Sequence, residues 1–375
     1  VSGVVTSVER GARRKVLSIT VEAAQEQDYE EFGKEDVSKM DAVSVKAALL
    51  KSGMFAFIKQ RPYDIVADPT VAPRAIFVSA FDTNPLAPDF ELALKGEEAN
   101  FQTGLDALAK IAKTYLSISV NQKAAALTQA KNVTLTVFDG PHPAGNVGVQ
   151  INNIAPINKG ETVWTIDPQA VIFIGRLFNT GHVDLTRLVA VTGSEVKKPS
   201  YCKLKVGALL TNVFAGNVST DKNLRYISGN VLTGKQITAN GFLGAFHSQV
   251  TVIPEGDDVH EMLGWIMPRF DQFSTSHSYF SWLMGKKEYT LDARVKGGER
   301  HMIMSNEYDR VLPMDIMPEY LIKAIIAGDI DRMEALGIYE VAPEDFALCE
   351  FVCSSKMELQ RIVREGLDML RREMC

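Results

Sequence analysis

The sequence has few cysteines, no long apolar run and no excess of positive charge. Its four cysteines, Cys202, Cys349, Cys353 and Cys375, are too few and too unevenly spaced for a disulfide framework, which fits a reducing cytosol. No apolar run approaches the roughly 18 residues that a membrane span needs. We therefore expect any membrane association to come through a partner. The formal net charge of −6 argues against a nucleic-acid partner.

What the sequence does contain is typical of a globular protein. Hydrophobic residues make up 46% of the 375 positions and charged residues 23%. A chain of this length and composition is expected to form about two to four domains with apolar cores.

The first residues predict a β-hairpin with nothing in front of it. Residues 1–22 have the pattern of two strands around a turn at residues 11–14. Because an isolated hairpin is only marginally stable in water, we expect that an amino-terminal segment was removed or never expressed. The acidic, polar stretch 23–41 then predicts a linker or a surface helix.

Strand and helix patterns alternate over residues 25–195, which predicts a parallel sheet covered by helices, a Rossmann-like domain. The predicted elements are a helix from Ser44 to a C-cap near Gly53, a buried strand at 75–80, an amphipathic helix at 98–117, a half-buried strand at 132–138 with Val133, Leu135 and Val137 on its apolar side, and a buried strand at 170–175.

Two of these strands run into loops that contain several prolines, and the second of these loops is also rich in glycine. The strand at 75–80 leads to Asp82 and Asn84, and the strand at 132–138 leads to Gly140, Pro143 and Gly145. Proline fixes φ and glycine permits turns, so the second loop is expected to be rigid and exposed. In open α/β sheets, ligands bind at the carboxyl ends of the strands.

The remaining chain predicts a β-rich block and then a helical block. Residues 196–255 contain short strands separated by glycine turns. Residues 229–236 imitate a phosphate-binding loop, but Gln236 stands where a magnesium-binding Ser or Thr belongs, so a turn between strands is the better interpretation. Helical patterns are expected from residue 257 onward, and they are clearest at 320–327, 331–336 and 355–374.

Three motifs carry a resemblance to a known family: GPHPAGNVG at 140–148, DTNPLAP at 82–88 and LCEFVC at 348–353. With these motifs in this order, the chain resembles the A subunit of the sodium-translocating NADH:quinone oxidoreductase from end to end. More distantly, it is similar to the C subunit of the Rnf complex and to the NADH-binding subunit of complex I.

The resemblance implies an α/β multidomain fold. Residues 1–24 would be the remnant of a barrel-sandwich (lipoyl-like) domain, 25–195 the Rossmann-like domain, 196–255 a β-grasp module of the SLBB type, and 256–375 a helical domain. It also implies a peripheral location on the cytoplasmic face of the bacterial inner membrane. There the chain would dock on the membrane subunits, especially the B subunit, and take part in quinone reduction coupled to sodium export.

The iron–sulfur ligands of the Rnf relatives are largely missing. Those relatives carry two C-x2-C-x2-C-x3-C motifs, because each cluster needs four thiolates. Six of the eight matching positions are not cysteine here. The eight positions, in chain order, are Met302, Ser305, Tyr308, Leu312, Pro343, Phe346, Cys349 and Cys353. We therefore expect no cluster. The two remaining thiols are best interpreted as small buried hydrophobes, with a redox pair or an intersubunit metal site as the alternative.

The glycine-rich nucleotide loop of the relatives is replaced by residues 51–57, which hold one glycine and several bulky side chains. We expect neither flavin nor NADH on this chain, and we expect NADH, FAD, FMN and the iron–sulfur cluster to bind other subunits. A quinone needs an apolar slot with one or two donors. The candidate residues are Phe55, Phe57, Lys59, Arg61, Tyr63 and His142.

Each candidate also has a structural interpretation. The phenylalanines would be core, Lys59 and Arg61 solvated, and His142 a brace of its loop against Asp82 or Asn84. Three functions thus compete. The chain is a cofactor-free subunit that contributes to quinone binding, a docking scaffold of the same complex, or a free-standing NADH or flavin oxidoreductase.

Overall fold

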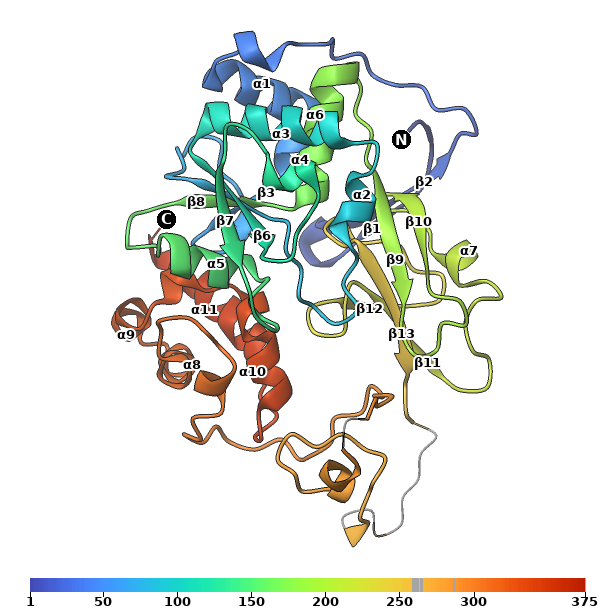
Figure 1. Cartoon of the computed structure of the whole chain (residues 1–375), viewed down its shortest axis with the longest axis vertical. Coiled ribbons are helices and arrows are strands. Elements are labelled where there is room, and N and C mark those ends of the chain that lie inside the picture. The colour runs from blue at the N-terminus through green and yellow to red at the C-terminus, as the bar shows by residue number, and fades with distance from the viewer. Residues whose placement is uncertain (258–262, 264–265, 286, 375) are drawn as a thin grey trace.

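The computed structural model describes residues 1–257, 263, 266–285 and 287–374. Its centre is a six-stranded sheet in the order β4-β3-β8-β5-β6-β7, in which β5, β6, β7 and β8 run parallel (Figure 1). The strands are β3 (Ile58–Arg61), β4 (Ile65–Val66), β5 (Ile76–Ser79), β6 (Thr114–Ser119), β7 (Thr134–Phe138) and β8 (Val163–Ile166). β3 pairs antiparallel with both β8 and β4, so the sheet is mixed and not wholly parallel as predicted. The chain is a mixed α/β protein, as expected.

Helices cover both faces of this sheet. Because side chains alternate along each strand, a single strand contributes to both cores. Ile76 and Val78 of β5 point into one core, while Phe77 points into the other. The first core is covered by α1 (Ala42–Ser52), α3 (Glu98–Ile111) and α6 (Pro168–Thr180), with α2 (Phe90–Leu94) and α4 (Ala125–Thr128) beside them. The second is covered by α5 (Val147–Ile154) and the carboxyl-terminal helices.

Residues 170–175 form part of helix α6, so the prediction of a strand there was wrong. Asp167 caps the helix by accepting hydrogen bonds from the amides of Gln169 and Ala170, and Pro168 occupies its first turn. The helix is buried nearly all round, which removes the polar face that distinguishes a helix from a buried strand in sequence.

Two glycines allow α3 and α6 to approach closely. A Cβ atom at Gly104 would lie 2.1 Å from the carbonyl oxygen of Val171, and one at Gly175 would lie 1.7 Å from that of Asn100. The helix pair therefore packs backbone against backbone, and larger side chains at either position would separate it.

The predicted helix 98–117 is also shorter than expected. Helix α3 ends at Ile111, and Leu116 lies in strand β6. Strand β7 is present as predicted, but it is an edge strand whose apolar set faces outward, with Leu135 and Val137 exposed. Its Thr136 faces the sheet interior, where its hydroxyl lies 2.9 Å from that of Ser117.

A second, five-stranded sheet follows in the order β10-β9-β13-β11-β12. Its strands are β9 (Thr186–Thr192), β10 (Ser200–Lys205), β11 (Leu224–Ser228), β12 (Lys235–Ile237) and β13 (Gln249–Pro254), with the short helix α7 (Thr211–Phe214) alongside. The sheet therefore starts before residue 196, where the β-grasp module was expected to begin. The phosphate-loop look-alike at 229–234 is the turn between β11 and β12, as interpreted from the sequence.

The carboxyl-terminal region is helical only in its last part. In the described residues between β13 and α8, the regular structure is limited to short 3-10 turns such as Phe280–Met284 and Tyr308–Arg310. The expectation of helices from residue 257 onward is therefore corrected. The helices are α8 (Pro318–Ala327), α9 (Ile330–Ala335), α10 (Ala347–Val352) and α11 (Leu359–Met374).

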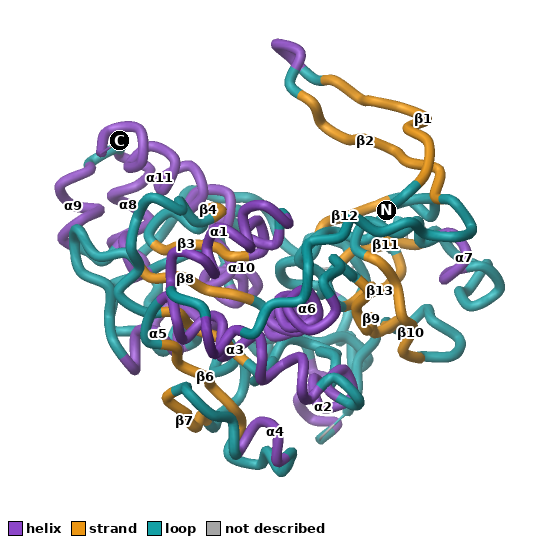
Figure 2. Tube along the Cα trace, turned by 90° about the horizontal axis from the view of Figure 1, so that it is seen from above, coloured by secondary structure: helices purple, strands orange, loops and turns teal. Residues whose placement is uncertain are grey.

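The amino-terminal hairpin consists of β1 (Gly3–Arg10) and β2 (Val16–Ala23), as the sequence predicts. Figure 2 shows it projecting from the body of the molecule. Both strands are almost entirely exposed. Among the described residues, no helix combines the length and apolar character that crossing a membrane requires.

Candidate functional site

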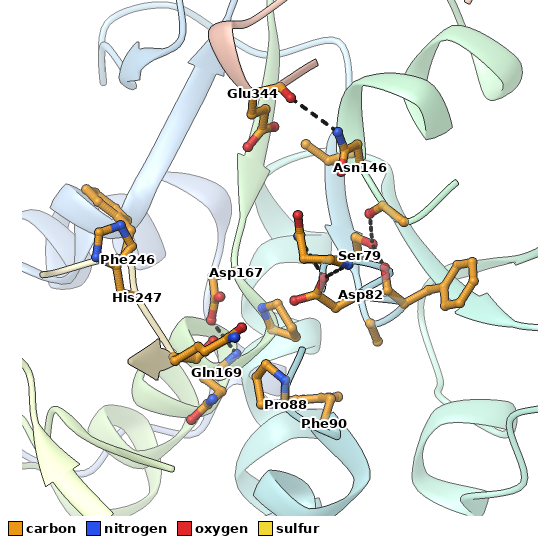
Figure 3. Close-up of a pocket in the computed structure, with 18 of the residues that line it drawn as sticks. Ser79, Asp82, Pro88, Phe90, Asn146, Asp167, Gln169, Phe246, His247 and Glu344 are labelled. Atoms are coloured by element: carbon orange, nitrogen blue, oxygen red, sulfur yellow. Dashed lines mark hydrogen bonds between the residues drawn. The ribbon is translucent and has the colours of Figure 1, made fainter. Parts of the chain in front are cut away.

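A cleft lies between the two sheets, outside the carboxyl ends of β5, β6 and β8 (Figure 3). From β5 the chain continues to β6 and β7 toward one edge of the sheet, and then returns to β8 on the opposite side of β5. This reversal of strand order is the place where open α/β sheets bind ligands. The cleft has a volume of about 410 Å³. On the side of the five-stranded sheet it is lined by Gly229, Asn230, Thr233 and residues 246–249.

The Asp82 loop and the proline- and glycine-rich loop that follows β7 meet on one wall of the cleft. Gly145 packs against the Asp82 loop so closely that a Cβ atom would lie 2.5 Å from the Phe81 carbonyl oxygen. Asp82 accepts hydrogen bonds from the backbone and side-chain amides of Asn84. Burial raises the pKa of the Asp82 carboxyl, these two hydrogen bonds oppose the rise, and the charge of Asp167 adds to it. Asp82, Asn84 and Gly145 thus line the cleft, as the loop motifs suggested.

His142 lies in the same loop pair, but it is not part of the cleft wall. Its Nδ1 atom lies 3.2 Å from the hydroxyl of Thr83, which also accepts a hydrogen bond from the amide of Gly145. Burial lowers the pKa of His142, and Asp82 opposes this effect. His142 therefore braces the loops through Thr83. This residue lies in the chain between Asp82 and Asn84, the two partners that the sequence suggested. Gly140, with a φ of 138°, and the buried Pro143 shape the turn beside it.

The opposite wall is aromatic and basic. Phe57 and Phe246 meet edge to face with ring centres 6.1 Å apart, and the ammonium group of Lys59 lies 5.0 Å from the centre of the Phe246 ring. Phe57 is nearly buried, whereas Phe246 is 40% exposed. Lys59 also lies 3.4 Å from Asp64. This wall offers the exposed, apolar ring of Phe246 with a hydrogen-bond donor, Lys59, beside it.

Arg61 lies two residues further along β3, so its side chain points to the same face of the sheet as that of Lys59, but it is buried among residues of the helical domain. Its side chain is 1% exposed and donates to Asp345 at 2.7 Å, to Glu344 at 2.8 Å and to the carbonyl of Glu340 at 3.1 Å. Burial lowers the pKa of Arg61, but the charges of Asp345 and Glu344 raise it more. The role of ligand donor predicted for Arg61 is therefore revised, because it joins the sheet domain to the helical domain instead.

The GPHPAGNVG motif makes room for this ion pair. A Cβ atom at Gly148 would lie 2.4 Å from the Asp345 carboxylate and 2.5 Å from the Arg61 guanidinium. Phe55 and Tyr63 are also structural. Phe55 is buried edge to face against Trp164, and the Tyr63 carbonyl accepts a hydrogen bond from Arg364.

His247 is a cleft residue that the sequence did not indicate. Its Nδ1 atom lies 2.8 Å from the hydroxyl of Ser228. Burial lowers the pKa of His247 to about 4, and the nearby charges of Arg187, Lys59 and Lys235 contribute. The only signal in the sequence is the glycine at 244, shortly before an aromatic residue and a histidine.

Arg187 lies buried behind this part of the cleft. Its guanidinium lies 3.7 Å from Asp167 and 5.4 Å from the centre of the Phe173 ring. Within the described residues, its three side-chain nitrogens form no hydrogen bond. Burial lowers the pKa of Arg187, and Asp167 opposes the shift. Arg187 thus balances the charge of the Asp167 carboxylate, which caps α6 at the cleft edge.

Comparison with known proteins agrees with the motifs. Residues 40–183 match the family model described as the NqrA second alpha/beta domain, and residues 188–239 match that of the NQRA C-terminal domain. The A subunit of the Na(+)-translocating NADH-quinone reductase of Yersinia pestis bv. Antiqua (strain Angola) is 36% identical over 99% of this chain and 84% of its own length. The chain belongs to this NqrA family.

Other members of the NqrA family match equally well. That of Neisseria meningitidis serogroup C / serotype 2a is also 36% identical over 99% of this chain and 84% of its own length. A NAD+-reducing [NiFe]-hydrogenase in the air-oxidized state is a much weaker structural match. The match has a TM-score of 0.40 and 13% sequence identity, and it covers 90% of this chain and 64% of the hydrogenase chain. A similarity this low does not inform the function.

In this NqrA-family chain, four of the eight positions that match the cluster motifs pack together in the core, and we call this packed group the thiol pocket (Tyr308, Phe346, Cys349 and Cys353). All four residues are buried. The Tyr308 hydroxyl lies 3.0 Å from the Cys353 sulfur. Burial raises the pKa of Cys349 to about 12, so the thiol stays protonated. Within the described residues, His, Cys, Asp and Glu nowhere gather in threes as a metal site would require.

Proposed function

We propose that this chain is the peripheral A subunit of a bacterial Na+-translocating NADH-quinone reductase and that its cleft receives the quinone headgroup. The observation that supports the family role is 36% identity over 99% of the chain. In this proposal the chain docks on the cytoplasmic face of the membrane subunits, especially the B subunit, and takes part in quinone reduction coupled to sodium export. Its hairpin, 1–24, would belong to a barrel-sandwich domain.

The observation that supports quinone binding is the aromatic and basic wall of the cleft. A quinone ring is planar and uncharged, so it suits packing against the exposed ring of Phe246, which Phe57 supports edge to face. Lys59 stands beside that surface and can donate to a carbonyl oxygen. Of the six residues predicted from the sequence, Phe57 and Lys59 line the cleft, and they are the ones that we retain as ligand contacts.

We further propose that the chain carries no flavin, NADH or iron–sulfur cluster, and that these bind other subunits. The residues do not fit such groups. In the loop that replaces the glycine-rich nucleotide loop, Met54, Phe55 and Phe57 are buried in the core. At the former cluster positions, Tyr308 and Phe346 occupy the interior of the thiol pocket. Backbone amides and thiolates are thus not offered where phosphate or iron would need them.

The proposal is tested by titrating the chain, co-purified with its membrane partners, with the short-chain quinone decylubiquinone. The expected result is saturable binding that is weakened by changes in the cleft, and an isolated chain that is colourless. Tight binding that no cleft variant alters would instead support the docking scaffold. Stoichiometric flavin or iron on the anaerobically isolated chain would support the free-standing oxidoreductase.

A further inference from the structure

His247 occupies a position in the cleft that is built to hold an imidazole. It lies next to Phe246 on the aromatic wall (Figure 3). A Cβ atom at Gly244 would lie 2.5 Å from Nδ1, and one at Gly229 would lie 3.4 Å from Nε2. The two glycines therefore leave just enough room for the ring. At Gly229 the φ of +101° also disfavours any other residue.

Ser228 determines which ring nitrogen carries the proton. Its hydroxyl oxygen accepts a hydrogen bond from the amide of Gly244 at 2.9 Å. The hydroxyl hydrogen then needs an acceptor, since Ser228 is 1% exposed. Among the described residues the acceptor in reach is Nδ1 of His247, at 2.8 Å. Nδ1 therefore carries no hydrogen, and the neutral imidazole has its proton on Nε2.

The surroundings keep this imidazole neutral. Arg187, Lys59 and Lys235 are the positive groups that act on it, and the ring is largely buried. A second proton on the ring would place another cation among these three, and it would also break the hydrogen bond from Ser228. Within the described part of the chain, Nε2–H has no hydrogen-bond partner, which makes it a donor available to the cleft.

We infer that His247, positioned by Ser228, donates from Nε2 to a carbonyl oxygen of the ligand in the cleft and acts with Lys59 as a second donor. The inference rests on the proposed function and identifies the ligand class more closely. The ligand is a planar ring with carbonyl oxygens, and not an anion, because Asp82, Asp167 and Glu344 also line the cleft. Its oxygens face two groups that can only donate.

The test titrates the complex of the chain and its membrane partners with decylubiquinone. Three variants are compared with the wild type first. His247→Phe keeps an aromatic ring and removes the donor, so affinity should fall roughly tenfold. His247→Gln restores an N–H donor and should recover most of the loss. His301→Phe, which changes an exposed histidine outside the cleft, is the matched control and should bind like the wild type.

Ser228→Ala tests the positioning role with a second readout. In wild-type protein, 15N NMR should show His247 with its proton on Nε2. The variant should show a mixture of tautomers and an affinity reduced several-fold. A wild-type proton on Nδ1, or unchanged affinity in His247→Phe while the wild type binds, would overturn the inference and leave the proposed function standing. If the wild type itself fails to bind decylubiquinone, both are overturned.

Discussion

The cleft and the thiol pocket contain different kinds of polar groups. The thiol pocket holds the cysteines that attract attention in the sequence, yet these are buried and packed with Tyr308 and Phe346. The cleft is lined by Lys59, whose ammonium group has further hydrogen-bond donors beyond its ion pair with Asp64, and by His247, whose Nε2 has no partner among the described residues. A site is therefore recognised here by polar groups left available at a gap in the packing. Residue type alone points to the wrong region.

Arg61→Met should have the largest effect, and on stability only. It leaves the Asp345 carboxylate buried without its cation, which costs about 3–5 kcal/mol. Urea unfolding should show this loss, while decylubiquinone affinity at a temperature where the variant is folded stays unchanged. Lys59→Met, on the same strand, is the matched control for stability. A loss of affinity in Arg61→Met without a loss of stability would return Arg61 to the ligand site.

The next effect is a dependence of stability on pH that comes from His247. Its pKa is lowered to about 4 in the folded protein, so the unfolded chain binds a proton more readily below the ordinary value of 6.5. Stability is fully present above pH 6.5 and falls as the pH drops toward 4. Because a pKa difference of one unit is worth about 1.4 kcal/mol, the free energy of unfolding should fall by about 3 kcal/mol in all.

This loss should be measured as the difference between wild type and His247→Phe in urea unfolding across that pH range. The subtraction removes the contribution of carboxylates that titrate in both proteins. A constant difference between the two proteins from pH 7 to 4 would show that His247 is not held neutral by the cleft.

Lys59→Met should weaken decylubiquinone binding by roughly tenfold, the lower end expected for a charge-assisted hydrogen bond of about 1.5 kcal/mol. The lower end applies because Lys59 is partly solvated and its side chain is 34% exposed. Lys39→Met is the control, since Lys39 is an exposed lysine of the same domain. Equal affinities for the two variants would favour the docking scaffold.

The smallest effect is expected in the thiol pocket. Cys349→Ala should cost roughly 1 kcal/mol of stability through lost packing and leave quinone reductase activity of the complex unchanged. Because burial raises its pKa to about 12, Cys349 in the folded protein should react with a thiol reagent at pH 8 only after unfolding. Rapid reaction of the native protein, or loss of activity in the variant, would make the thiols functional.

Much of the fold was predictable from local patterns. The strand at 75–80, the helix ending at Gly53 and the turn between β11 and β12 depend on alternation, capping and turn residues that lie close together in sequence. The three motifs led to the family for the same reason, since each is a short, contiguous string. The loops with Asp82 and Gly145 were placed at the cleft because strand ends of a parallel sheet share one edge.

Tertiary structure decided the rest, because the deciding contacts join distant residues. Helix α6 has the sequence pattern of a buried strand, and only its burial on all sides, against α3 and the sheet, explains that pattern. Arg61 lies two positions from Lys59, yet its role follows from Asp345, 284 residues later in the chain. The donor role inferred for His247 depends on Ser228 and Gly229, which lie 18 to 19 residues earlier in the chain and pack against its ring. Local sequence carries periodicity and turn chemistry, whereas the protonation and availability of a side chain depend on the neighbours that folding brings to it.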